Sequence, residues 1–319
     1  MSHAARPLYT DPDKRRSLDD LAAMVVDGAV VAVGGGLSAR APMALLRALL
    51  RRNAKGLSVV GSAHGIDIDL LSAGGALARS SESYVGFEQD FGLAPNYRRA
   101  LESGAVAIDD SCCYTLVQQL RAAIQGLPFM PLRSLRGTSF PALHPEYRRM
   151  ICPFTGEELL LVPALEPDVA LIHAQYGDTK GNLLIQGPPV ADILFAKASK
   201  LVLATVEEIV ETKRLRELSG VSVPYFYVSA VCETKLGAHP TSCYPFYAYD
   251  RPHTALYHKT ARKSAEVFAA DYLAVFVHGA ATQGAYLKAI GGEATRARLA
   301  NWRDGADAWK RLYTGEDAP

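Results

Sequence analysis

A glycine-rich segment directly after a short apolar run has the composition of a loop that contacts a ligand through its backbone. Gly34-Gly-Gly36 follows the run 29–33 and precedes a helix opened by Pro42. Three interpretations fit. The spacing Gly34-x-Gly36-x-x-Ala39 is close to a dinucleotide-binding fingerprint. The glycines also suit a tight turn with positive φ. Alternatively, backbone N–H groups of the loop hold an anionic or carbonyl oxygen.

The segment after the next apolar run disfavours the dinucleotide interpretation. That fingerprint needs an acidic residue at the end of the next strand, to hold a ribose hydroxyl. Here the run 57–60 leads into Gly61-Ser-Ala-His-Gly65, which has no carboxylate. The turn and the oxygen-binding loop both stay open. We predict substrate-binding roles for Gly34, Gly35, Gly36 and Ser38.

Histidine and cysteine residues do not form a recognisable set of metal ligands. The cysteines are Cys112, Cys113, Cys152, Cys232 and Cys243, an odd number without Cys-x-x-Cys spacing. This pattern predicts reduced thiols and no metal site. His173 follows a buried run and is expected to be structural. His239, in a loop before a proline, is a candidate for lining the substrate site.

Apolar runs alternate with helix-like stretches, which predicts an α/β fold with a mainly parallel sheet and helices on both faces. The runs are 29–33, 57–60, 105–108, 168–173, 200–205 and 221–231. The helix-like stretches include one after a capping box at Ser17 and Asp20, then 42–50, 115–124, 191–199, 207–218 and 263–277.

The remaining segments set the domain prediction. Six prolines between 129 and 167 predict irregular loops in the middle of the chain, and aromatic and histidine-rich loops are expected after Leu236. We predict one domain over residues 1–290, including a C-terminal helical extension, followed by a peripheral charged tail at 291–319.

The charge balance excludes some classes of partner. Lys and Arg number 34 against 33 Asp and Glu, so the formal net charge is +1. Such a balance predicts no nucleic-acid partner, because binding a phosphate backbone needs a basic excess. The segment up to Arg16 has no apolar core, and no apolar run approaches the ~18 residues of a membrane span. We therefore expect a cytoplasmic protein without a membrane partner.

Several segments, in order along the chain, resemble family I coenzyme A transferases, specifically the alpha subunit of glutaconate CoA-transferase. They are Asp27–Leu37 with Pro42, Leu127–Thr138, Cys152–Gly156 with Val162–His173, Gly177–Asn182, Glu207–Val210, Gly237–Pro240 and Tyr244–Tyr247. The transferase expectation rests on this resemblance, since composition and periodicity indicate only an α/β protein.

The resemblance implies a ping-pong mechanism with a coenzyme A thioester as substrate and no permanently bound cofactor. A glutamate carboxylate attacks the donor acyl-CoA and forms a mixed anhydride. The CoA thiolate then makes a glutamyl thioester, which an acceptor carboxylic acid resolves. A carboxylate suits this role because it is a nucleophile and an acyl carrier. Backbone donors, as in a glycine loop, are expected to meet the developing oxyanions.

In glutaconate-type enzymes the resemblance places this glutamate on the beta subunit, in a Ser-Glu-Asn-Gly-like motif. The present sequence lacks that motif, and its Glu102-Ser-Gly104 is typical of a helix C-terminus. We therefore expect no catalytic nucleophile in this chain and a beta subunit of the same fold as its partner.

Two alternatives remain. Ring-opening CoA thioester hydrolases of steroid breakdown resemble the same family, and there the resemblance implies a catalytic glutamate in the alpha chain. The corresponding position here is Cys113, with Asp109 and Asp110 nearby, so these three are weak catalytic candidates. A cysteine cannot replace a carboxylate base without different chemistry. The second alternative is a ligand-binding sensor of the same fold, which the neutral charge and the lack of a helix-turn-helix segment disfavour.

Two arginines complete the candidate site. Arg133 and Arg136 lie in a segment that matches the family, and their guanidinium groups suit CoA phosphates or a substrate carboxylate. Exposed solvated charge is the alternative interpretation for both.

Overall fold

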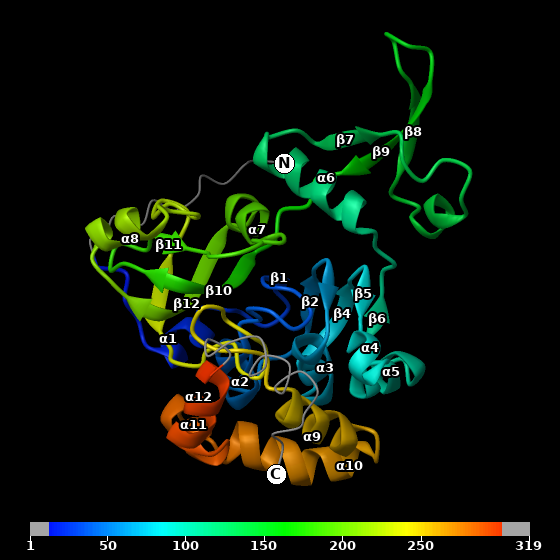
Figure 1. Cartoon of the computed structure of the whole chain (residues 1–319). Coiled ribbons are helices and arrows are strands. Elements are labelled where there is room, and N and C mark those ends of the chain that lie inside the picture. Colours follow the sequence, from blue (N-terminus) through cyan, green and yellow to red (C-terminus); the bar gives the residue numbers. More distant parts are fainter. Residues whose placement is uncertain (1–12, 302–319) are drawn as a thin grey trace.

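The central layer of the computed structural model, which describes residues 13–301, is a mainly parallel sheet (Figure 1). Its strand order is β13-β12-β10-β1-β2-β4-β6, and each neighbouring pair on this path is parallel. In that order the strands span Ala230–Glu233, Leu201–Ile209, Val169–Gly177, Val30–Val33, Leu57–Val60, Leu77–Ser81 and Ala107–Ile108. Strand β11 (Leu183–Leu184) pairs antiparallel with β10. The predicted fold class is confirmed.

Strand β1 shows why its sequence is apolar at every position. It lies between β10 and β2, and its successive side chains point to opposite faces of the sheet. Val31 and Val33 pack into one core and Ala32 into the other, all at 0% exposure. A strand covered on both faces therefore needs the continuous apolar run that the sequence has.

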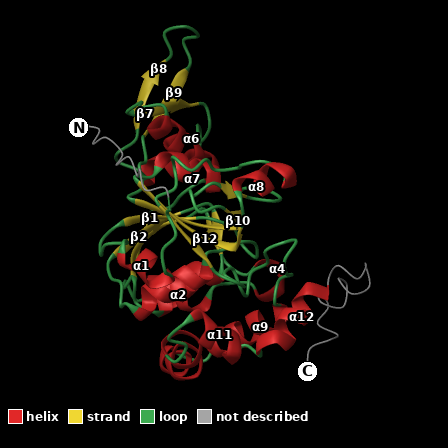
Figure 2. Ribbon diagram, turned by 90° about the vertical axis from the view of Figure 1, so that its left-hand side faces the viewer, coloured by secondary structure: helices red, strands yellow, loops and turns green. Residues whose placement is uncertain are grey.

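Helices cover both faces, as Figure 2 shows. The core that contains Val31 is closed by α1 (Leu18–Ala23), α2 (Met43–Arg51), α3 (Ile66–Ala73), α5 (Pro95–Glu102), α9 (Arg251–Ala261), α10 (Ala265–Phe268) and the π-helical segment η2 (Ala269–His278). The core that contains Ala32 is closed by α6 (Cys113–Ile124) and α7 (Asp192–Ala198). The remaining elements include α4 (Glu88–Phe91), α8 (Thr212–Leu218), α11 (Gln283–Ala289) and α12 (Gly292–Ala300), with the parallel pair β3 (Ala63–His64) and β5 (Tyr84–Val85).

Some element boundaries differ from the sequence predictions. The capping box of Ser17 and Asp20 is confirmed. The stretch 207–218 is not one helix, because β12 continues to Ile209 and α8 begins at Thr212. The run 221–231 is mostly turns before β13, and Pro224 within it lacks the N–H that a central strand requires.

The prediction of irregular loops between 129 and 167 is wrong. This segment forms a separate three-stranded antiparallel sheet with the order β7-β9-β8, which projects from the main body in Figure 1. Its strands are β7 (Phe129–Leu132), β8 (Arg148–Ile151) and β9 (Glu158–Pro163), with a 3₁₀ turn, η1, at Phe140–Leu143. Pro131 is tolerated because β7 is an edge strand. We call this projecting segment the arm. Its small core is formed by Leu132, Tyr147, Leu160 and Val162.

The C-terminal extension is more helical than predicted. The expected helix 263–277 is present as α10 and η2, but α9 was missed within a segment predicted as loops. The signal for α9 is Asp250, whose carboxylate caps the helix by accepting from the N–H of His253. Leu299 of α12 is fully buried beside Leu236 and Tyr247. Residues 302–319 of the expected tail lie outside the described residues, so the division at 290 stays a prediction.

Helices long and apolar enough to span a bilayer are absent from residues 13–301.

The glycine loop after β1 is a tight turn clamped to its surroundings. Gly35 has a φ of +77°, and a Cβ there would lie 2.6 Å from the carbonyl carbon and oxygen of Arg40. Gly36 does not have positive φ, and a Cβ there would meet Ala63 and Val190 at an ordinary 3.5 Å. The turn interpretation therefore applies to Gly35 and not to Gly36.

We predict opposite outcomes for alanine at these two positions. Gly35→Ala forces a left-handed alanine against backbone atoms and should cost about 2–4 kcal/mol of the free energy of unfolding. Gly36→Ala, the matched control, should change it by less than about 1 kcal/mol. Urea unfolding followed by circular dichroism measures both. Equal effects of the two substitutions would contradict the turn geometry.

Candidate functional site

The candidate site lies at the edge of the sheet where the parallel strands end. Gly34 follows β1, Gly61 follows β2, Glu82 follows β4 and Asp109 follows β6. These four strands are neighbours, so their carboxyl ends share one edge. Open α/β sheets bind ligands at this edge.

A pocket of about 290 Å³ opens beside the glycine loop. It is lined by Leu37, Ser38, Gly65, Ile66, Gly86, Phe87, Glu88, Asp90, Tyr249 and Thr254. Ser38 is exposed there, and its role in binding stays a prediction. Asp90 forms an ion pair with Arg251 at 3.4 Å, so its charge is already partly balanced.

A second hollow, of about 380 Å³, lies between the strand ends and the antiparallel arm. Asp109 and Asp110 both line it, together with Ser81 and with His144 of the arm. Asp109 is held by an ion pair with Arg79 at 2.5 Å and accepts a hydrogen bond from the Ser81 hydroxyl. The structure thus brings the two predicted aspartates to one cavity wall.

Cys113 is exposed at the first position of α6. The hydroxyl of Ser62 donates a hydrogen bond to its Sγ at 3.1 Å. A hydroxyl is not the base that a nucleophilic thiol requires, so this environment gives Cys113 no activating partner.

Glu82, which the sequence analysis did not single out, is a buried carboxyl directly after β4. Its side chain is 1% exposed, and neither oxygen has a hydrogen-bond partner among the described residues. The Nε2 atom of His64 lies 3.8 Å from Oε2. The Nδ1 atom of the same ring is 2.5 Å from Asp67, whose other oxygen accepts from the N–H groups of Gly65 and Ile68.

Burial and the neighbouring charges determine the protonation of this group. Burial raises the pKa of Glu82 to about 8; the Asp67 charge adds to the rise and His64 opposes it. Burial lowers the pKa of His64, but the charge of Asp67, joined by that of Glu82 when Glu82 is ionised, outweighs it and raises that pKa to about 9. Asp67 is the ionised partner of the imidazolium, since it is the closer carboxylate and its pKa is lowered despite its burial. Near neutral pH Glu82 therefore carries a proton.

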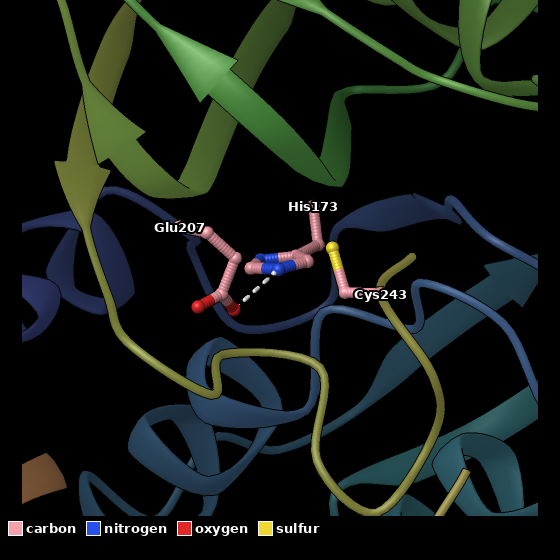
Figure 3. A group of neighbouring side chains, drawn as sticks. All are labelled: His173, Glu207 and Cys243. Carbon is pink, nitrogen blue, oxygen red and sulfur yellow. Dashed lines mark hydrogen bonds and ion pairs between the residues drawn. The ribbon is translucent and has the colours of Figure 1, made fainter. Parts of the chain in front are cut away.

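A second buried carboxylate, Glu207, lies at the end of β12 (Figure 3). It accepts four hydrogen bonds, from the His173 ring at 3.0 Å, the Tyr247 hydroxyl at 2.8 Å, and the N–H groups of Leu236 and Gly237 at 2.8 Å each. Three of these donors, the His173 ring, the Tyr247 hydroxyl and the Gly237 N–H, meet Oε1, and the Leu236 N–H meets Oε2. Glu207 is therefore a structural anion that ties the sheet to the loop after β13.

Potential metal ligands are also gathered here. One ligand atom each of His173, Glu207 and Cys243 lies within 4.8 Å of the others. The remaining ring nitrogen of His173 contacts the Thr205 hydroxyl at 2.8 Å, and burial raises the pKa of the Cys243 thiol well above its usual value. A protonated thiol and a fully engaged imidazole are poor ligands. We interpret the trio as a hydrogen-bonded core.

Three other predicted residues are not brought to the sheet edge. His239 is 0% exposed, and its ring contacts the Tyr286 hydroxyl at 2.8 Å and Asp250 at 3.0 Å within the C-terminal extension. This geometry corrects the expectation that it lines the substrate site. Arg133 and Arg136 lie on the antiparallel arm, where both form ion pairs with Glu157.

We predict that Glu207→Gln lowers the free energy of unfolding by about 3–5 kcal/mol, because the amide N–H₂ would then face at least one buried donor, the N–H of Leu236. Glu208→Gln is the matched control on the same strand. Glu208 is half-exposed and its ion pair with Lys235 spans 3.6 Å. Its substitution should therefore change the free energy by no more than about 0.5 kcal/mol. Urea unfolding of both variants measures the difference, and a tolerated Glu207→Gln would refute the structural role.

Sequence comparisons match the chain to known proteins. Residues 15–234 match the family model described as coenzyme A transferase. The A-type subunit of 3-oxoadipate CoA-transferase from Pseudomonas knackmussii is 34% identical over 71% of this chain and 80% of its own length. The cholesterol ring-cleaving hydrolase IpdA subunit of Mycobacterium tuberculosis is 34% identical over 75% of this chain and 85% of its own. An uncharacterized protein of Archaeoglobus fulgidus is 34% identical over 90% of this chain, which spans 64% of that protein.

Structural comparison gives the same result. The glutaconate coenzyme A-transferase of Acidaminococcus fermentans superposes with a TM-score of 0.83, covering 90% of this chain and 95% of that chain, at 29% identity. The family match spans more than half of the chain. The chain belongs to the coenzyme A transferase family and is an alpha-type subunit, similar to the one of glutaconate CoA-transferase.

Proposed function

We propose that the chain is the alpha subunit of an acyl-CoA:carboxylate CoA-transferase that is built from two kinds of subunit and works in the cytoplasm. The nucleophilic glutamate would stand on a beta subunit, which carries CoA as a glutamyl thioester between donor and acceptor. The observation that carries this proposal is the near-complete superposition on glutaconate coenzyme A-transferase. The substrates are then an acyl-CoA and a carboxylic acid, without a permanently bound cofactor.

Three carboxyl groups of this chain are poorly suited to act as the nucleophile, which supports a nucleophile on another subunit. Glu102 ends α5 on the surface and forms an ion pair with Arg98 at 2.7 Å. Glu207 is buried and already accepts four hydrogen bonds within the chain, which leaves it poorly placed for attack on a substrate. Glu82 is protonated near neutral pH, which suppresses its nucleophilicity. A partner carboxylate fits the mechanism better than any of these three.

The pocket beside the glycine loop suits the acyl group. Ser38 offers a hydroxyl at its mouth, and Ile66 and Phe87 supply apolar walls. Its charged lining residues are Glu88 and Asp90, so a second carboxylate on the acyl chain would meet like charge there. The proposal therefore places the thioester end of the substrate near the glycine loop.

Hydrolysis is the second candidate, because Asp109 and Asp110 line one cavity at the end of the sheet. There an aspartate would activate water in place of the glutamate expected of the hydrolase branch. A complex that releases free acid from acyl-CoA without any acceptor acid would favour this function over transfer.

We predict that the purified chain alone does not exchange CoA and that a beta subunit of the same family, co-expressed with it, restores the activity. Transfer is measured as labelled CoA moving from acyl-CoA to free acid. Incubation with the donor alone should leave a CoA adduct on the partner, visible by mass spectrometry of the intact subunits.

The matched control for that experiment is Cys113→Ser, which should keep most of the turnover in the complex. A CoA adduct on this chain, or a loss of ~1000-fold on Cys113→Ser, equal to about 4 kcal/mol of barrier, would contradict the assignment.

A further inference from the structure

The glycine loop does not offer the hydrogen-bond donors expected of it. The N–H groups of Gly34, Gly35, Gly36 and Leu37 donate within the protein, to the Leu171 carbonyl, the Asp192 carboxylate, the Ala39 carbonyl and the Ala63 carbonyl, at 2.8–3.0 Å. Acyl transfer nevertheless develops negative charge on a carbonyl oxygen, which needs donors in a water-poor site. The donors must come from other groups at this edge.

Glu82 has the unsatisfied polar atoms that such a site would show. A buried polar group without a partner costs free energy, so most buried carboxyls in proteins are hydrogen-bonded. Both oxygens of Glu82 lack a hydrogen-bond partner among the described residues, although its side chain is 1% exposed. A group from outside the chain would complete this environment.

His64 is oriented to act with Glu82. Its Nδ1 is bound to Asp67, and this leaves Nε2 directed at the Glu82 carboxyl. Both side chains converge on Gly61 at the end of β2. A Cβ at residue 61 would lie 2.5 Å from Nε2 and 2.5–2.6 Å from the two carboxyl oxygens. Only glycine at this position lets the two groups approach the strand end.

The pair is next to space that a substrate can enter. Ser81, directly before Glu82, lines the 380 Å³ hollow, and Gly65, directly after His64, lines the 290 Å³ pocket. The acyl thioester of the proposed function is expected at this edge of the sheet.

Burial keeps Glu82 neutral; of the charges around it, Asp67 adds to the rise of its pKa and His64 opposes that rise. His64 on β3 and Asp67 on α3 form an ion pair beside it, and Asp192 on α7 adds negative charge near the imidazolium. Tyr97 on α5, whose hydroxyl donates a hydrogen bond to Ser80, is a further titratable group in this region. A neutral carboxylic acid donates a hydrogen bond, whereas a carboxylate would repel an oxyanion.

We propose that neutral Glu82 and the imidazolium of His64 donate hydrogen bonds to the thioester carbonyl oxygen of acyl-CoA, with Asp67 as a positioning residue. The inference rests on the proposed function. When a carboxylate attacks the thioester carbon, a C–O bond forms and the carbonyl π electrons move to oxygen, where the two donors stabilise them. When the C–S bond breaks, its electrons leave with the CoA thiolate and the carbonyl re-forms. Glu82 and His64 keep their protons throughout.

The variants Glu82→Gln and Glu82→Ala in the assembled complex test this role. Glutamine keeps an N–H donor and does not titrate, so Glu82→Gln should retain kcat within ~10-fold. Glu82→Ala removes the donor and should lose ~100-fold or more. The wild-type kcat should fall as pH rises through about 8, and this fall should be absent from Glu82→Gln. Glu102→Gln, on the surface of α5, is the control and should match the wild type.

Other outcomes overturn the proposal. A Glu82→Gln variant as slow as Glu82→Ala would make Glu82 a base or nucleophile, and a fully active Glu82→Ala would remove it from the site. If Glu82→Ala fails to assemble, the pH profile of Glu82→Gln decides, because a merely structural residue would leave the fall near pH 8 in place.

A second measurement separates this proposal from the transferase assignment. Acetyl-CoA labelled with ¹³C at the carbonyl is the probe, and its C=O stretch is recorded by difference infrared spectroscopy when bound to the complex. Donation by Glu82 and His64 should lower that frequency in the wild type and less in Glu82→Ala. The measurement needs no turnover. An equal frequency in both proteins refutes the donor role even if CoA exchange occurs, and a shift without exchange refutes only the transferase assignment.

Discussion

The buried carboxylate of Glu207 fixes the position of the chain that follows the last strand of the sheet. Four donors converge on one carboxylate, and they come from β10, from the turn at Leu236 and Gly237, and from Tyr247. The Tyr247 hydroxyl in turn accepts from the N–H of Ala238. The loop after β13 is therefore fixed to the sheet. That loop carries His239, which binds Tyr286 of α11 and Asp250, the cap of α9, so the helical extension inherits its position from the same anion.

A buried ion pair between Arg40 and Asp192 fixes the position of the glycine loop. Arg40 reaches across to Asp192 of α7 at 3.1 Å and also donates to the carbonyl oxygens of Pro188 and His173. The other oxygen of Asp192 accepts from the N–H of Gly35. Buried pairs of this kind add specificity more reliably than stability. As a result, the N–H groups of the three glycines donate within the protein. Hydrogen bonds to a ligand at this edge of the sheet must therefore come from side chains.

Sequence patterns predicted the sheet because burial on both faces leaves a strong signal. The runs that became β1, β2, β10 and β12 are mostly apolar over their first residues. The arm was missed because its small core has only alternate apolar residues among prolines, as at Leu160 and Val162. Glu82 and Glu207 were not recognised as buried, since a carboxylate in a sequence carries no mark of its burial. Burial of a carboxylate depends on its partners in the folded chain, here His64 for Glu82 and Tyr247 for Glu207. Neither partner is a neighbour in sequence, so no local pattern reveals the contact.

The strand order also determines how the chain must fold. Val31 of β1 pairs with Val59 of β2 on one side and with Val169 of β10 on the other. The first partner follows within a few tens of residues, whereas the whole arm and α6 lie between β1 and the second partner. Pairing between distant segments slows folding, because closing the long connecting loop costs conformational entropy before the contacts between the strands form. During synthesis β1 therefore has one open edge until β10 has emerged, and an unpaired apolar strand edge is a template for misassociation with other chains.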